Sequence, residues 1–223
     1  MQLEQDGYAI ETQVFETAEI AQLIARIGAA ALPRSRAGIR HAMKNADVAE
    51  LARDSRLLGM AQSVLGPDAF PFRATLFDKS PTSNWLVVWH QDTALPLRER
   101  RETPGWGPWS VKDGVIYAHA PASALSQVLA LRVHLDRSTG ANGPLRVLPG
   151  THTLGVLGDH ELHELSSRVD AADCLMPAGG VLAMKPLIVH ASSKSQSESP
   201  RRVLHIEYAT PATVSDGLAL ATA

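Results

Sequence analysis

At 223 residues, with a formal net charge of −2 and 45% hydrophobic residues, the sequence has the composition of a globular protein, which excludes a disordered chain. The near-neutral charge excludes the basic footprint that binding to nucleic acid requires. Cys174 is the only cysteine, which excludes a disulfide framework and a multi-thiolate zinc site and fits a reducing cytoplasm. With no apolar stretch of membrane-spanning length, we expect one cytoplasmic domain over residues 1–223 and no membrane partner.

Helices are predicted for the N-terminal third of the chain. From Glu16 to Ala31 the apolar residues recur at the spacing of helical turns, and Thr17 is a candidate N-cap. A second helical region, with a broken amphipathic pattern, is predicted from Ala46 to Leu65. Residues 1–70 are therefore expected to form a mostly helical support against one side of a sheet.

Short β-like runs, separated by turn residues, occupy residues 71–210. Runs of this length and spacing are typical of a β-sandwich or a jelly roll. We therefore expect a mainly β core with flanking α-helices. The runs are Phe72–Lys79, Trp85–His90, Gly114–His119, Gln127–Leu135, Leu145–Leu148, Gly180–Met184, Ile188–Ala191 and Arg202–Tyr208.

A polar segment rich in proline and glycine, residues 93–113, lies between two of these runs. It also contains Trp106 and Trp109, and long loops that carry aromatic residues often serve as lids. We predict a lid loop here, whose two tryptophans either close over a substrate or pack within the loop. The alanine-rich stretch after Pro211 is predicted to be a loose tail.

Two histidines and one aspartate are placed where they could hold a metal ion. His90 and Asp92 end an apolar run, and side chains two residues apart on a strand point to the same face. His190 ends another apolar run. Two imidazoles and one carboxylate leave coordination positions open, as an iron(II) oxygenase needs for its cosubstrate and O2. A His-x-Asp triplet alone also arises by chance, so the surrounding residues have to decide.

Two residues that follow His190, Ser192 and Arg201, support a metal site that binds 2-oxoglutarate. Arg201 follows a polar loop, and a guanidinium can grip the distal carboxylate that 2-oxoglutarate presents after its keto acid chelates a metal. Ser192 could donate a hydrogen bond to the same carboxylate. Because adjacent residues on a strand face opposite ways, only one of Arg201 and Arg202 can enter the barrel.

Arg132 also alternates with apolar neighbours, Leu131 and Val133, and so projects from the opposite face of its strand. If it is buried, its charge needs a partner. That partner is either a cosubstrate or substrate carboxylate or a structural acid.

Taken together, these blocks resemble the phytanoyl-CoA dioxygenase family of 2-oxoglutarate-dependent oxygenases. The likeness extends over nearly the whole chain. The matching residues are Asp6–Tyr8, Phe77–Pro81 with Asn84, Trp89–Asp92, Leu131–Asp136, Asn142–Leu145, Val147–His152 and His190–Ser192 with Arg201.

The resemblance implies a double-stranded β-helix (jelly roll, cupin-like) that uses Fe(II), O2 and 2-oxoglutarate. It places the metal on His90, Asp92 and His190, and the cosubstrate clamp on Arg201 and Ser192. Arg202 then points outward.

Further roles follow from the same resemblance. Lys79 and Arg132 are candidate cosubstrate contacts, and Asn84 joins Trp106 and Trp109 as a candidate substrate contact. Relatives that halogenate carry a small residue in place of Asp92, so its presence favours hydroxylation of a small molecule. The family name does not imply an acyl-CoA substrate, because no basic cluster for a CoA phosphate is present.

Two other functions remain open. One is a cupin-like metalloenzyme that uses the same triad without 2-oxoglutarate, against which Arg201 argues. The other is a non-catalytic jelly-roll binding protein with a vestigial site. The residues leave the oligomeric state, monomer or homodimer, undecided.

Overall fold

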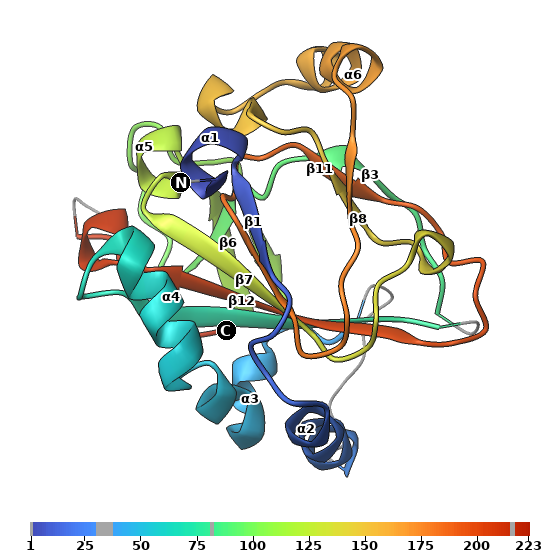
Figure 1. The fold of residues 1–223 in the computed structure, drawn as a ribbon. Helices are drawn as coiled ribbons and strands as arrows, with labels where there is room; N and C mark the ends of the chain where they lie inside the picture. The colour runs from blue at the N-terminus through green and yellow to red at the C-terminus, as the bar shows by residue number, and fades with distance from the viewer. Residues whose placement is uncertain (1, 30–37, 81–82, 215–216) are drawn as a thin grey trace.

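The computed structural model describes residues 2–29, 38–80, 83–214 and 217–223, which form antiparallel sheets with helices on opposite sides (Figure 1). The α-helices are α1 (Gln2–Asp6), α2 (Thr17–Ala29), α3 (Ala46–Leu51), α4 (Ser55–Leu65), α5 (Ala122–Leu125) and α6 (Asp159–Arg168). Of these, α2, α3 and α4 lie on one side of the sheets and α6 lies on the opposite side. The 3-10 helices are η1 (Ala42–Lys44), η2 (Gly140–Asn142), η3 (Thr151–Leu154) and η4 (Pro211–Thr213). The strands are β1 (Tyr8–Glu11), β2 (Phe70–Lys79), β3 (Val87–His90), β4 (Ala94–Leu97), β5 (Trp109–Lys112), β6 (Val115–His119), β7 (Val128–His134), β8 (Leu145–Val147), β9 (Ala172–Cys174), β10 (Val181–Met184), β11 (His190–Ser192) and β12 (Arg201–Ala209).

Two sheets carry the residues of interest. The larger has the strand order β1-β10-β7-β12-β2, and the smaller has the order β3-β11-β8-β9. Every pair of neighbouring strands is antiparallel. Many of these neighbours are far apart in sequence, as expected of a jelly roll, so residues from distant segments meet between the sheets.

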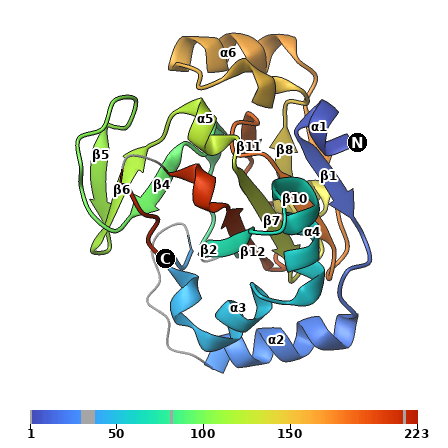
Figure 2. The ribbon, with the colours of Figure 1, turned by 90° about the vertical axis from the view of Figure 1, so that its left-hand side faces the viewer.

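Helices α2, α3 and α4 cover the outer face of the larger sheet (Figures 1 and 2). Leu57 of α4 is fully buried there, in one cluster with Leu131 and Leu204 of the sheet. Alternation along β7 and β12 therefore sends Arg132 and Arg201 to the opposite face, toward the smaller sheet. The predicted placement of Arg132 opposite Leu131 and Val133 agrees with this arrangement.

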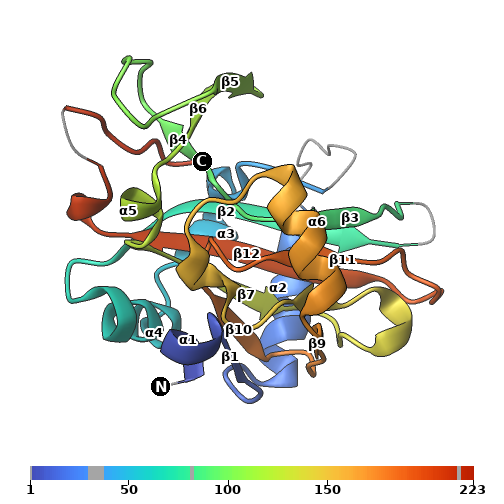
Figure 3. The ribbon, with the colours of Figure 1, turned by 90° about the horizontal axis from the view of Figure 1, so that it is seen from above.

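The predicted lid loop over residues 93–113 is partly wrong, because the segment contains two strands. β4 and β5 pair with β6 on either side, as a third sheet beside the barrel (Figures 2 and 3). Asp113 and Gly114 both have positive φ, the conformation of a two-residue hairpin turn, which joins β5 to β6. Pro96, Pro104 and Pro108 suggested a loop, yet proline is compatible with an edge strand such as β4, which contains Pro96.

Three further predictions need correction. The helical region over 46–65 is two helices, because Asp54 accepts a hydrogen bond from the backbone N–H of Arg56 and begins α4 anew. The N-terminal support also contributes β1, the edge strand of the larger sheet. The supposedly loose tail is packed, since the backbone of Ala223 bonds to Phe72 and Ala74.

The helix predicted over residues 16–31 agrees with α2 up to Ala29, and its last two positions lie outside the described residues. In the part of the chain that the structure describes, no helix is long and apolar enough to cross a membrane.

Candidate active site

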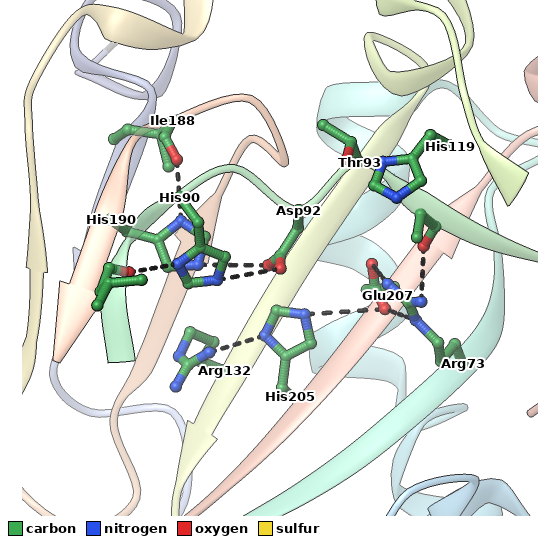
Figure 4. A network of polar contacts seen from close by, with 12 residues as sticks. Arg73, His90, Asp92, Thr93, His119, Arg132, Ile188, His190, His205 and Glu207 are labelled. Carbon is green, nitrogen blue, oxygen red and sulfur yellow. Dashed lines mark hydrogen bonds and ion pairs between the residues drawn. The ribbon is translucent and has the colours of Figure 1, made fainter. Parts of the chain in front are cut away.

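Strand pairing brings the two predicted histidines together. His190 of β11 and His90 of β3 are directly opposed in the antiparallel ladder, and their ring centroids lie 4.2 Å apart. Asp92 follows β3, where its backbone N–H donates to the carbonyl of Pro186 at 2.9 Å. The three side chains thus meet at one edge of the smaller sheet, as Figure 4 shows.

The donor atoms of this triad can surround one ion. His90 Nε2 lies 3.7 Å from Asp92 Oδ1, and His190 Nε2 lies 3.5 Å from Asp92 Oδ2. All three donor atoms lie within 4.8 Å of one another. Two ligands held about 2.1 Å from one ion at a right angle are about 3 Å apart, which is close to these separations.

Both imidazoles are oriented for metal binding by their own strands. His90 Nδ1 lies 2.8 Å from the carbonyl of Val88, and His190 Nδ1 lies 2.9 Å from that of Ile188 (Figure 4). Because a carbonyl only accepts, each Nδ1 carries the proton and each Nε2 keeps a free lone pair. Backbone contacts of this kind fix the tautomer that a metal-binding histidine needs.

Burial and charge set the protonation of the triad. Burial lowers the pKa of His190 to about 3, so that its imidazole is neutral at neutral pH. Burial alone would raise the pKa of Asp92, but His190 and His90 outweigh it and hold the pKa well below its usual range. Burial would likewise lower the pKa of His90, and the hydrogen bond and charge of Asp92 raise it instead. Asp92 is therefore a carboxylate facing two imidazoles.

A cavity beside the triad, which we call the inner cavity, contains three buried cations. Lys79 of β2, Arg132 of β7 and Arg201 of β12 all line it together with His90, Asp92 and His190. Each of the three cations is at most 5% exposed. The lining residues are Phe77, Lys79, Trp85, Val87, His90, Asp92, Arg132, Leu145, His190, Ser192 and Arg201.

Hydrogen bonds within the inner cavity leave two buried arginine nitrogen atoms unpartnered by any described residue. Lys79 Nζ donates to Ser192 Oγ at 2.6 Å, and Ser192 Oγ donates to the carbonyl of Gly143 at 3.0 Å. Arg201 Nε donates to the carbonyl of Asn142 at 3.2 Å, while its buried Nη1 has no hydrogen-bond partner among the described residues. Arg132 Nε is buried without a partner as well.

These cations also repel one another. Burial, followed by the charges of Arg201 and Arg132, lowers the pKa of Lys79 to about 7. Burial and the charge of Arg132 lower the pKa of Arg201 to about 10. Among the described residues that line the inner cavity, the only carboxylate is Asp92. A buried cluster of this kind favours an anionic ligand.

Arg202 faces the other way, as strand alternation and the family resemblance together predict. Its guanidinium forms two hydrogen bonds of 2.8 Å with the carboxylate of Asp136. It does not line the inner cavity.

A second cavity, which we call the outer cavity, shares Phe77 and Asp92 with the inner one and has a volume of about 180 Å³. A buried ion pair between Arg73 and Glu207 lies in its wall (Figure 4). His205 stands between the cavities. Its Nδ1 is 2.9 Å from Arg132 Nη1, and its Nε2 is 3.8 Å from Glu207. Because arginine only donates, Nδ1 of His205 is the acceptor and Nε2 carries the proton toward Glu207.

Comparison with known proteins decides the family. The family model for phytanoyl-CoA dioxygenase matches residues 3–203. The chain belongs to the phytanoyl-CoA dioxygenase family. The family predicted from the sequence motifs is therefore confirmed.

Two relatives with known names share this family likeness. The L-proline trans-4-hydroxylase of Streptomyces griseoviridis is 26% identical over 72% of the chain, which spans only 62% of that protein. The ectoine dioxygenase of Stutzerimonas stutzeri is 22% identical over 92% of the chain and 74% of that protein.

The structure is similar to that of EctD from S. alaskensis with 2-oxoglutarate and 5-hydroxyectoine. The TM-score is 0.73 at 21% identity, with 96% of this chain and 76% of that chain covered. The predicted mainly β, jelly-roll fold is thereby confirmed.

The three residues predicted to contact substrate, Asn84, Trp106 and Trp109, lie outside both cavities of this chain. Asn84 Nδ2 donates to the carbonyl of Ser195, and Asn84 Oδ1 accepts from the backbone N–H of Ser195, at 2.8 Å each. Trp106 and Trp109 are half-buried against a cluster that includes Phe72 and Leu95. Neither cavity is lined by any of the three. The tryptophans thus pack against this cluster, and a contact with substrate stays a prediction.

Residues in the outer cavity were missed by the sequence reasoning, although signals for some of them exist. His205 and Glu207 lie four and six residues after Arg201, so strand alternation puts all three on one face. Lys112 precedes an Asp-Gly pair, a strong hairpin signal that would have placed β5 opposite β6. Arg73 precedes Phe77 and Lys79 by four and six residues, so alternation puts it on their face of β2. Arg40 carries no such local signal.

Proposed function

We propose that this chain is an Fe(II)- and 2-oxoglutarate-dependent dioxygenase that hydroxylates a small molecule and releases succinate and CO2. One observation carries the proposal: a triad of two imidazoles, each held by its Nδ1 on a backbone carbonyl, and a carboxylate opens onto a cavity with three buried cations. The first part suits a metal and the second suits an anionic cosubstrate.

The donor set fits iron(II). Two imidazole nitrogens and one carboxylate oxygen on one side of an ion leave the other positions open, and this set is typical of non-haem Fe(II) oxygenases. His90, Asp92 and His190 would hold the ion through Nε2, a carboxylate oxygen and Nε2. When bound with O2 and 2-oxoglutarate, the ion would supply the oxidative chemistry that side chains lack.

The inner cavity fits 2-oxoglutarate. Arg201 Nη1, buried and without a partner, is available to one oxygen of a distal carboxylate, and Ser192 and Lys79 lie on the same wall. Arg132 Nε offers a second unpartnered donor. Taking a dianion into this cavity would offset three buried positive charges that otherwise repel one another.

The relatives support a small substrate. Their names record ectoine and L-proline as substrates of those proteins. The carboxylate of Asp92 would fill the coordination position that a halide would need, which favours hydroxylation over halogenation. We place the enzyme in the cytoplasm, as a monomer or homodimer without a nucleic-acid or membrane partner.

The two rival functions are less well supported. A cupin-like metalloenzyme without 2-oxoglutarate would have no use for three cations beside the triad. A binding protein with a vestigial site would not need both imidazoles fixed in the metal-binding tautomer.

Anaerobic titration separates these functions. Adding Fe(II) and then 2-oxoglutarate to the protein should produce a visible charge-transfer band that neither gives alone. Arg201→Gln should require more 2-oxoglutarate to reach the same band. A protein that binds Fe(II) but gives no band with 2-oxoglutarate would be the cupin-like enzyme. One that binds no metal would be the binding protein.

A further inference from the structure

The outer cavity is the place left for a substrate if the inner cavity takes 2-oxoglutarate. Asp92 lies in the wall of both cavities, so the candidate metal position is between them. With a volume of about 180 Å³, the outer cavity is smaller than the roughly 300–1,000 Å³ of pockets for drug-sized ligands. It therefore suits a compact metabolite.

The charges that line the outer cavity do not cancel. Three cationic side chains, Arg40, Arg73 and Lys112, face two carboxylates, Asp92 and Glu207. The charge of Arg73 is neutralised by a bidentate ion pair with Glu207. The Nη1 atom of Arg73 also donates to the carbonyl of Ala94 at 2.8 Å. Arg40 and Lys112 remain, with Asp92 as the one other charge.

Lys112 is the cation with the least compensation. Among the residues that the structure describes, it has no carboxylate partner, and its Nζ lies 4.9 Å from the ring centroid of Tyr117. Burial, followed by the charges of Arg73 and Arg40, lowers its pKa. Arg40 has only a long, exposed contact of 3.5 Å with Asp113. Arg40 and Lys112 are nevertheless both exposed, so they lie at the mouth of the outer cavity, where it opens to solvent.

Metal binding would make the net charge of the outer cavity more positive. Asp92 is the remaining carboxylate that attracts Lys112, and a divalent ion on Asp92 would take up that charge. Lys112 and Arg40 would then face a cavity without a free anion, which an anionic ligand would correct.

We propose that the outer cavity binds a small substrate carrying a carboxylate, which Lys112 and Arg40 hold at the mouth while the rest of the molecule reaches toward Asp92. This inference rests on the proposed function, because it assigns the inner cavity to 2-oxoglutarate. The assignment gives the β5–β6 hairpin a role in specificity, since Lys112 is the last residue of β5 and Arg40 contacts the turn residue Asp113.

The experiment measures binding rather than turnover. Protein loaded with Ni(II), which does not support oxidation, is first titrated with 2-oxoglutarate by calorimetry. With 2-oxoglutarate saturating, L-proline and other small amino and hydroxy acids are then tested, each paired with its primary amide. The shift in melting temperature identifies acids that bind, and calorimetry gives their dissociation constants.

We expect at least one acid to bind and its amide to bind at least about tenfold more weakly. Lys112→Gln should weaken the acid by about fivefold to tenfold and leave the amide nearly unchanged, whereas Lys112→Arg should keep most of the preference. Lys44→Gln, which removes an exposed lysine outside both cavities, is the matched control.

The outcomes separate the two proposals. If 2-oxoglutarate does not bind, the proposed function fails. If 2-oxoglutarate binds but no acid is preferred over its amide, or Lys112→Gln affects acid and amide equally, the carboxylate assignment is overturned while the function stands.

Discussion

Arg201 of β12 and Lys79 of β2 are directly opposed across the larger sheet, so that two buried cations share one face of one strand pair. Side chains opposite each other in a sheet interact, and like charges in that position are destabilising. The repulsion is reduced because Lys79 Nζ donates to Ser192 Oγ and to the carbonyl of Ser193, and because the pKa of Lys79 is lowered to about 7.

The first prediction concerns the two adjacent arginines. Arg201→Gln should raise the dissociation constant of 2-oxoglutarate about thirtyfold or more, because truncating one partner of a buried charge pair costs about 2–5 kcal/mol, and about 1.4 kcal/mol is tenfold. Arg202→Gln is the matched control, since that guanidinium binds Asp136 instead. Calorimetric titration of both variants checks this. Equal losses in the two would contradict the assigned strand faces.

The second prediction concerns pH. Lys79 has a lowered pKa of about 7, and a bound dianion would favour its charged form. The affinity for 2-oxoglutarate should therefore be highest below about pH 7 and fall as the pH rises, by up to about tenfold per unit until the pKa of the complex is reached. Binding near pH 8 should take up a proton, which calorimetry in two buffers of different ionisation enthalpy detects.

Lys79→Gln provides the control for this pH effect. It should bind 2-oxoglutarate more weakly and lose the decline above neutrality. A wild-type affinity that stays constant through this range would exclude Lys79 from the cosubstrate site.

The third prediction concerns the metal. Asp92→Ala should weaken Ni(II) or Fe(II) binding at least about a hundredfold and abolish hydroxylation, because a first-row site loses its only anionic ligand. Asp173→Ala, which removes a half-exposed carboxylate of β9, should leave metal affinity unchanged. Calorimetry with Ni(II) measures both. Unaltered metal binding in Asp92→Ala would remove this residue from the site.

The fourth prediction concerns stability. Leu57 of α4 is fully buried against the larger sheet, so Leu57→Ala should lower the free energy of unfolding by about 2–5 kcal/mol. Leu58 is only partly buried at the edge of the same cluster, and Leu58→Ala should cost clearly less. Urea denaturation of the two variants gives the comparison. Similar losses at both positions would mean that α4 packs with a different face.

The metal triad could be predicted because its signals are local. His90 and Asp92 are two residues apart on one extended segment, and their partner His190 ends a second apolar run. Alternation also placed Arg132 opposite its apolar neighbours and put Arg201 and Arg202 on opposite faces, and the family resemblance chose Arg201 as the inward one.

The features that could not be predicted from the sequence depend on pairing between segments that are far apart along the chain. β4 contains Pro96 and β5 directly follows Pro108, so both resemble a loop, and only their pairing with β6 makes them strands. The same holds for the packed tail, where Ala223 pairs with backbone of β2. Arg40 joins the outer cavity beside Asp113, 73 residues away along the chain, a separation that no local pattern reports.

The opposed positions of His90 and His190 also bear on local stability. β3 is the outermost strand of its sheet, hydrogen-bonded to a single neighbour, β11. An ion that joins the two imidazoles would cross-link that edge strand to the next one and close a long stretch of chain. Opening of β3 would then require release of the ion, so its backbone amides should exchange with deuterium far more slowly once metal is bound.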